Sequence, residues 1–205
     1  MKLLGLYRSP YVRRVAVSLN LLGLKFDHDP VAVFEDPDVI KAHNPLIRIP
    51  TLLLDDGEAL VESYAILDTL EEMSAPGKRL LPDPGPDRRR VMKLTAVATG
   101  TMDKTVWAVY EGRFHPKEEF HKPWVEHNEA QALGGLEYLD AAAKATGDGW
   151  MAGGAAISQA DVSAVVAYSF AVMARPKLGV AEKCPALGAF AARLEATDAF
   201  SSVTP

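Results

Sequence analysis

Apolar residues in the first third of the chain come in short runs that alternate with amphipathic stretches. Short apolar runs bounded by turn residues are typical of strands, and apolar positions three and four apart indicate helices. The pattern predicts strands at 2–7, 26–33, 51–54 and 59–61, and helices at 11–22, 36–43 and 63–73. The order is therefore βαβαββα, which indicates an α/β domain with a mixed sheet.

The strand pattern ends near residue 75. The stretch "MSAPGKRLLPDPGPDRRR", residues 73–90, holds four prolines and two glycines, which punctuate loops. Beyond it, helical patterns cover residues 87–111, 116–145, 158–174 and 185–196. The sequence therefore predicts an α/β domain at 1–75, a linker at 76–86 and an all-α domain at 87–205.

Composition narrows the class of protein. The net charge of −5 argues against a nucleic-acid partner, and no apolar run reaches the length of about 18 residues that a membrane span needs. One cysteine, Cys184, excludes a disulfide framework and a cysteine-based zinc site. His115, His121 and His127 are six residues apart and do not share a helix face, so we expect no metal. The expected location is the cytoplasm.

The stretch "RIPTLL" places Pro50 directly before an apolar strand. Proline cannot donate a ladder hydrogen bond, so it belongs at the first residue or the edge of a strand. If the Ile49–Pro50 bond is cis, the backbone of Ile49 is offered to an extended peptide ligand. The alternative is a trans proline that starts a strand.

The stretch "VESYAI" places Glu62 and Ser63 at a helix N-terminus, straight after a strand. Free N–H groups and the helix dipole make this position a receptor for a carboxylate. Ser63 adds a hydroxyl donor, and Glu62 accepts from an ammonium group, so an α-amino acid head fits here. The alternative is that Ser63 only caps the helix.

The stretch "RSPYVRR" places Ser9 before the helix predicted at 11–22. A hydroxyl at that helix N-terminus can donate to an anion such as a thiolate. Arg13 and Arg14 follow, and they either support the site or lie on a solvated helix face.

The order and spacing of these segments resemble a known family. Residues 1–80 resemble the thioredoxin-like domain of the cytosolic glutathione transferases, through "SPYVRRV", "NPLIRIPTLLLDDG" and "VESYAILDTLEE". The segment "GGAAISQADVSAVVA" resembles the capping-box segment of the family's second domain, with Ser158 and Asp161 as the box. The resemblance covers nearly the whole chain. It implies a thioredoxin-like N-terminal domain followed by an all-α bundle.

The resemblance also explains why a serine occupies position 9. Thioredoxin-like oxidoreductases carry a redox cysteine after the first strand, and Ser9 occupies that place here. Without a cysteine, disulfide exchange by the enzyme is excluded at this site. The resemblance implies the serine-type classes, like the bacterial theta, zeta and nu types, in which Ser9 holds the glutathione thiolate. Tyr7 and Tyr11 are the alternative donors.

The resemblance further assigns the parts of glutathione. It places the γ-glutamyl head at Glu62 and Ser63, and the cysteinyl backbone at Ile49 beside a cis Pro50. Arg48 either reaches the glycyl carboxylate or is solvated.

Two positions near the glycyl end depart from the family pattern. Ile47 stands where the family often has a polar residue or glycine, and Tyr64 stands where Arg, Asn or Leu is common.

An aromatic row at i, i+3 and i+7 comprises Trp107, Tyr110 and Phe114. With Tyr11, these residues are the candidates for the pocket of a hydrophobic electrophile, since this part of the second domain faces that pocket in the family. The alternative is that the row belongs to the core.

The implied function is that of a glutathione transferase in detoxification, with glutathione as co-substrate, a small hydrophobic electrophile as partner and no metal. A homodimer is expected from the resemblance. Three enzymatic alternatives on the same fold are a glutathione-dependent isomerase, a dehalogenase and a peroxidase. A non-catalytic module for glutathione binding or protein interaction is the alternative from another class.

Overall fold

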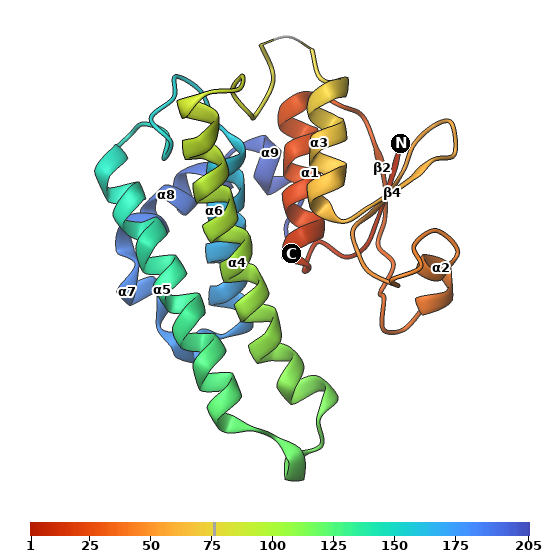
Figure 1. The fold of residues 1–205 in the computed structure, drawn as a ribbon, viewed down its shortest axis with the longest axis vertical. Coiled ribbons are helices and arrows are strands. Elements are labelled where there is room, and N and C mark those ends of the chain that lie inside the picture. Colours follow the sequence, from red (N-terminus) through yellow and green to blue (C-terminus); the bar gives the residue numbers. More distant parts are fainter. Residues whose placement is uncertain (76) are drawn as a thin grey trace. The chain divides into compact units, whose positions relative to one another are not determined.

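The computed structural model describes residues 1–75 and 77–205. The chain divides into two compact units. The first unit comprises Met1–Leu81 together with Glu195–Pro205, and the second comprises Pro82–Leu194. Figure 1 shows the sheet and its short helices in the first unit and the long helices in the second.

The first unit has the predicted element order. Its elements are β1 (Lys2–Leu4), α1 (Pro10–Leu22), β2 (Asp27–Asp29), α2 (Pro37–Lys41), β3 (Thr51–Leu53), β4 (Ala59–Val61) and α3 (Ser63–Met73). The sheet order is β2-β1-β3-β4, with β1 parallel to β2 and the other neighbours antiparallel. The predicted mixed sheet and βαβαββα order are therefore confirmed.

Two strands are shorter than predicted. The expectation of strands at 2–7 and 26–33 was wrong in length, because β1 ends at Leu4 and β2 at Asp29. Gly5 follows β1 with φ 125°, a left-handed value that turns the chain out of the sheet. Pro30 follows β2 and cannot donate a ladder bond.

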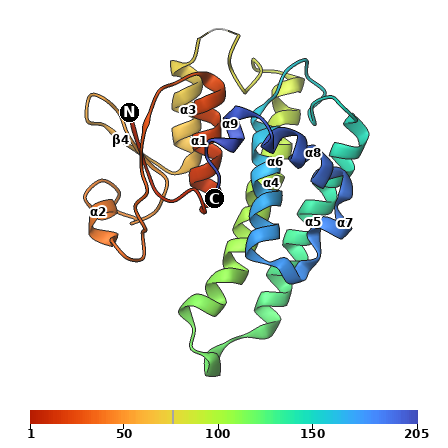
Figure 2. The same cartoon turned by 180° about the vertical axis from the view of Figure 1, so that it is seen from behind.

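Helices cover both faces of the sheet. In Figures 1 and 2, α1 and α3 lie side by side on one face and α2 lies on the other. Leu3 and Leu52 are cross-strand partners and fully buried, whereas Leu4, the next residue of β1, packs against Ile40 of α2. This alternation is the period of two of a strand covered on both faces. The first unit is thus a thioredoxin-like α/β domain.

The C-terminal segment does not stay with the helical unit. We expected the all-α domain to run to residue 205, but Glu195–Pro205 belong to the first unit, with α9 (Asp198–Ser201) among them. Both terminal N–H groups of Arg13 donate to Glu195, one of them at 2.8 Å, and Arg13 Nε donates to the Val203 carbonyl at 3.0 Å. Arg13 is 2% exposed, and a buried guanidinium requires such partners.

The second unit is all-α, as predicted. Its elements are α4 (Pro86–Phe114), η1 (Lys117–Glu119), α5 (Lys122–Thr146), α6 (Gln159–Ala174), η2 (Pro176–Leu178), α7 (Val180–Lys183) and α8 (Pro185–Glu195). Helix α5 begins six residues later than the pattern predicted, because Pro116 and the short η1 turn intervene. Of the described residues, no single helix is long and apolar enough to cross a membrane, although the bent pair Gln159–Ala174 with Pro176–Lys183 passes on length and composition.

The predicted capping box of α6 is present. Ser158 is the N-cap, and its N–H and hydroxyl donate to Asp161 Oδ2 at 2.8 and 2.7 Å. The other oxygen of Asp161 accepts from the N–H of Met151 at 2.8 Å. One fully buried carboxylate therefore joins the start of α6 to the loop before it.

The expected linker begins at residue 76, which lies outside the described residues. Its remainder contains no helix until α4 begins at Pro86. The N–H groups of Leu80 and Leu81 donate to the buried carboxylate of Glu71 in α3, at 3.0 and 3.4 Å. This part of the linker is therefore attached to the first unit.

Replacing Gly5 by alanine would test how closely the first unit is packed around this residue. A Cβ at Gly5 would lie 2.7 Å from Val12 Cγ2 and 2.8 Å from Ile49 Cβ, at a backbone angle that L-residues avoid. We expect Gly5→Ala to lower the free energy of unfolding by about 2–4 kcal/mol, measured by urea denaturation. Gly57 has φ 93° but no atom within 4 Å of such a Cβ, so Gly57→Ala should cost only about 1–2 kcal/mol. Equal losses would contradict the packing argument.

Candidate functional site

The three sequence motifs meet at one end of the sheet. Leu4, the last residue of β1, pairs with Thr51, the first of β3, and Thr51 pairs with Val61, the last of β4. The chain therefore leaves β1 toward α1, enters β3 from Pro50 and leaves β4 into Glu62, all at this end. The register alone brings the three predicted segments together.

Ser9 lies at the N-terminus of α1. It is the N-cap residue, and its Oγ accepts from the N–H of Val12 at 3.5 Å. That contact uses an oxygen lone pair and not the hydroxyl proton. The half-buried hydroxyl thus lies at the positive end of the helix dipole, where an anion is stabilised.

Tyr7 and Tyr11 flank Ser9. The Tyr7 ring is stacked on His28, with ring centroids 3.8 Å apart and an interplanar angle of 8°. Partial burial raises the pKa of the Tyr7 hydroxyl above its usual value of 10.0, so this group stays protonated at neutral pH. Tyr11 is half-buried in the first turn of α1.

The Ile49–Pro50 bond is cis, as the family resemblance implied, so the alternative of a trans proline is wrong. The loop before it is organised by Asn44, which is fully buried. Asn44 Nδ2 donates to the Arg48 carbonyl at 2.9 Å, and its Oδ1 accepts from the N–H of Leu46 at 2.9 Å. One amide side chain therefore shapes the approach to Pro50.

Ile47 adopts a left-handed backbone conformation, with φ 52°. A β-branched residue is rare in this region, and a glycine would adopt it without steric cost. The Ile47 side chain packs, partly buried, against the apolar cluster of Leu4, Val31 and Ile40. Ile47 therefore makes an apolar contact that a glycine could not make, but it adopts a backbone conformation that is unfavourable for a β-branched residue.

Glu62 and Ser63 open α3. Glu62 is the N-cap with φ 66°, and Ser63 is the first helical residue, so the alternative that Ser63 is the cap is wrong. Ser63 is buried, and its Oγ accepts from Arg14 Nη1 at 3.5 Å. Arg14 is 1% exposed, and its guanidinium carbon lies 5.0 Å from the centre of the Tyr64 ring.

The buried guanidinium of Arg14 thus lies next to the start of α3. The alternative that Arg13 and Arg14 lie on a solvated helix face is wrong, because both are almost fully buried. The partner of each arginine could not be predicted from the local sequence pattern. Arg14 adds positive charge to the end of α3 that the helix dipole already makes positive.

Arg48 and Glu62 form an ion pair. Arg48 Nη1 lies 2.9 Å from Glu62 Oε1, and both side chains are partly exposed. Glu62 was assigned to the γ-glutamyl head, and Arg48 either to the glycyl carboxylate or to solvent, yet here the two side chains bind each other. An ammonium group arriving at Glu62 would compete with Arg48 for the carboxylate.

The predicted aromatic row runs along α4 in the second unit. The Tyr110 ring is T-shaped to both neighbours, at centroid distances of 6.5 Å to Trp107 and 5.1 Å to Phe114. Trp107 is 52% and Phe114 54% exposed, so the core alternative is wrong for both.

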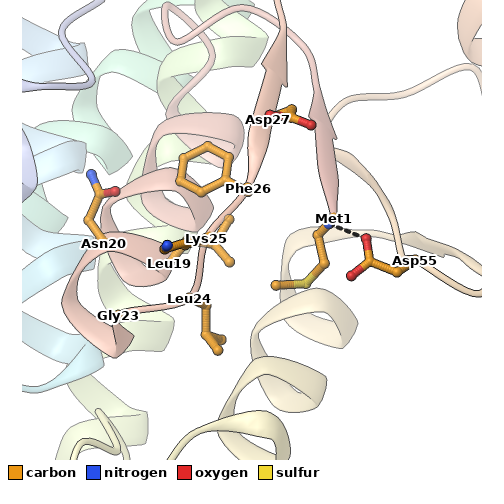
Figure 3. A pocket seen from close by; sticks show the side chains of 9 residues that line it. All are labelled: Met1, Leu19, Asn20, Gly23, Leu24, Lys25, Phe26, Asp27 and Asp55. Carbon is orange, nitrogen blue, oxygen red and sulfur yellow. Dashed lines mark hydrogen bonds and ion pairs between the residues drawn. The ribbon is translucent and has the colours of Figure 1, made fainter.

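A hollow of about 660 Å³ lies at the opposite end of the sheet. Figure 3 shows its lining, which includes Met1, Asp27 and Asp55, and the ion pair of 2.5 Å between the Met1 amino group and Asp55. Asp27 opens β2, and Asp55 follows β3. The lining contains none of the predicted site residues.

The described part of the chain contains neither a cluster of side chains placed to hold a metal ion nor a reactive cysteine thiol. Over residues 1–75 and 77–205, no group of three or more His, Cys, Asp or Glu side chains is placed to hold a metal ion. Cys184 is fully buried, and burial raises the pKa of its thiol to about 11. A thiol with that pKa is a poor nucleophile at neutral pH.

Comparisons with known proteins agree with this geometry. The family model "Glutathione S-transferase, N-terminal domain" matches residues 3–78. The chain is 32% identical over 111 residues to the uncharacterized GST-like protein YibF of Escherichia coli, covering 54% of each protein. It is 31% identical over 150 residues to the maleylacetoacetate isomerase of Pseudomonas aeruginosa, covering 68% of this chain and 69% of that protein.

The likeness extends to a solved structure. A glutathione S-transferase of Methylobacillus flagellatus, crystallised with glutathione bound, superposes with a TM-score of 0.91 at 28% identity, over all of this chain and 98% of that one. Matched sequence, matched fold and three motifs gathered at one sheet end lead to the same assignment. The chain therefore belongs to the cytosolic glutathione S-transferase family.

Proposed function

We propose that the chain binds glutathione at the sheet end that carries Ser9, Pro50 and Glu62, and transfers it to a small hydrophobic electrophile. The observation that carries the proposal is the register that brings these three segments together. Glutathione bound to the Methylobacillus flagellatus relative supports it. The proposal includes a homodimer in the cytoplasm, as the family resemblance implies.

The γ-glutamyl head is assigned to the start of α3. Glu62 accepts from the ligand ammonium, and Ser63 with the N–H groups in the first turn of α3 binds the carboxylate. The buried Arg14 behind Ser63 adds favourable charge for that carboxylate. An α-amino acid head carries both groups on one carbon, so it matches this pair of neighbours.

The remaining parts of the tripeptide are assigned to the loop before β3. Ile49 lies outside the ladder of β3 with β1, which begins at Thr51. Its backbone is proposed to pair with the cysteinyl backbone of glutathione as an added strand. Arg48, released from Glu62 by the ligand ammonium, is proposed to bind the glycyl carboxylate.

The chemistry requires a thiolate, and Ser9 can supply enough stabilisation. A free cysteinyl thiol titrates near ~8.5, and lowering that pKa by about 2 requires roughly 2.7 kcal/mol. A hydrogen bond to a charged group contributes about 1.5–3 kcal/mol, and a helix N-terminus about 0.3–1 kcal/mol. Ser9 therefore need not ionise. The thiolate sulfur then forms a bond to an electrophilic carbon. In a displacement that carbon expels a leaving group with its bonding electron pair. In an addition the electron pair of the double bond moves to the neighbouring atom, which takes up a proton.

Ser9 is preferred to the two tyrosines as the thiol donor. Ser9 is itself the N-cap of α1, so its hydroxyl and the helix dipole act at one point. Tyr7 instead lies in the loop before α1, where its ring is held in a stack with His28.

An isomerase is the second candidate, because the Pseudomonas aeruginosa relative bears that name. In an isomerisation, the thiolate adds to an activated double bond, the carbon–carbon bond rotates, and elimination returns glutathione. Counting free thiols during turnover separates the two functions. A transferase consumes one thiol for each product, whereas an isomerase consumes none.

Ser9→Ala should raise the pKa of the bound glutathione thiol toward its free value of ~8.5. The thiolate fraction at neutral pH, and with it kcat, should fall about 10- to 30-fold. Ultraviolet absorbance of the bound thiolate against pH measures the shift. Tyr7→Phe is the matched control and should leave the pKa of the thiol unchanged. A normal rate in Ser9→Ala with a slow Tyr7→Phe would assign the role to Tyr7 instead.

Glu62→Gln should weaken glutathione binding about 5- to 30-fold, because a charge-assisted hydrogen bond to the ligand ammonium becomes a neutral one. Isothermal titration calorimetry measures the dissociation constant. Glu58→Gln changes an exposed carboxylate in the β3–β4 turn and serves as the control. Equal affinity in both variants would remove Glu62 from the site.

Trp107→Ala should raise the KM for a hydrophobic aryl halide about 5- to 30-fold while leaving the KM for glutathione unchanged, because it removes apolar contact area from one substrate only. Steady-state kinetics with each substrate varied in turn measure the two constants. Trp124→Ala, at a partly exposed tryptophan of α5, is the matched control. A parallel rise in both KM values would argue for a general disturbance of the fold.

A further inference from the structure

Strand β2 holds the loop that carries Ser9. The loop spans residues 5–9, between β1 and α1. The N–H of Gly5 donates to the Asp29 carbonyl at 2.9 Å, and the Gly5 carbonyl lies 2.8 Å from His28 Nε2. A carbonyl oxygen only accepts, so Nε2 of His28 carries a proton and donates. Both polar backbone groups of Gly5 are thus bound by neighbouring residues of β2.

The same imidazole holds a second point of the loop. The rings of His28 and Tyr7 are nearly parallel, with centroids 3.8 Å apart. Two residues of a five-residue loop, Gly5 and Tyr7, are therefore fixed by one side chain. The N–H of Ser9 in turn donates to the Leu6 carbonyl at 2.9 Å, and Leu6 lies between those two points.

We propose that His28 is a positioning residue for the thiol-activating hydroxyl of Ser9. His28 bonds Gly5 and stacks on Tyr7, and the loop transmits this restraint through Leu6 to Ser9. The inference rests on the proposed role of Ser9 as thiol donor. A hydrogen bond to a thiolate weakens steeply when its donor is misdirected, so the restraint acts on the pKa of the thiol more than on the affinity for glutathione.

Two substitutions separate the contributions of the imidazole. His28→Phe keeps a flat ring against Tyr7 and removes the donor to Gly5. His28→Gln keeps an N–H donor at nearly the same place and removes the ring. His127→Phe is the matched control, since His127 is also stacked on an aromatic ring, that of Trp124, but belongs to α5 of the second unit.

In His28→Phe we expect the pKa of the bound glutathione thiol to rise by about 0.5–1, with the thiolate fraction and kcat about 1.5- to 3-fold lower at neutral pH. The dissociation constant of glutathione should change by less than about twofold, since His28 touches no proposed ligand group. His28→Gln should recover at least half of the loss. Amide hydrogen exchange of residues 5–9 in the free protein should quicken in His28→Phe and not in His127→Phe.

Two results would overturn the inference. If His28→Phe quickens exchange in the loop but leaves the thiol pKa at the wild-type value, the loop is restrained without effect on Ser9. If exchange does not change, His28 does not hold the loop. Should His28→Phe fail to fold, Tyr7→Leu removes the same stack from its other side, and it must raise the thiol pKa where Tyr7→Phe does not.

The failure of the proposed function gives a different result. If Ser9→Ala leaves the pKa of the bound thiol as in the wild type, Ser9 is not the donor. In that case His28 cannot position the donor either, and both proposals are wrong. If Ser9→Ala raises that pKa and His28→Phe does not, only the inference about His28 is wrong.

Discussion

The register of the sheet is the constraint on which the candidate site depends. Leu4, Thr51 and Val61 lie side by side at one end of three neighbouring strands. Each strand either begins or ends there, so the pairing of the strands brings together three segments that are far apart in the chain. A slip of one residue in any of these strands would turn its side chains to the other face and separate the segments.

Two adjacent arginines of α1 place positive charge near the candidate site and connect α1 to other parts of the first unit. Arg13 and Arg14 are both buried but face different partners, Glu195 in one case and Ser63 in the other. A buried guanidinium is costly unless anions or hydrogen-bond acceptors surround it. Helix α1, which Ser9 caps, therefore contacts both the C-terminal segment and the start of α3.

Much of the fold and of the site followed from the sequence, because their signals are local. Periodicity predicted the element order, and the residues around Pro50 and Glu62 marked the ends of elements. What could not be predicted depends on distant partners. The pairing of Arg13 with Glu195 spans 182 residues, and that of Arg48 with Glu62 depends on the loop shaped by Asn44. The role of His28 was also hidden, since nothing in its local pattern relates it to Gly5.

The return of Glu195–Pro205 to the first unit has a consequence for synthesis. Residues 1–81 of the first unit leave the ribosome before those of the helical unit, and domains generally fold in the order of their synthesis. Here, however, the anion for Arg13 and the buried side chains of Phe200 and Val203 arrive about 180 residues later. During translation the nascent unit therefore carries an uncompensated guanidinium and an uncovered face of α1, and it is completed only after the helical unit has been made.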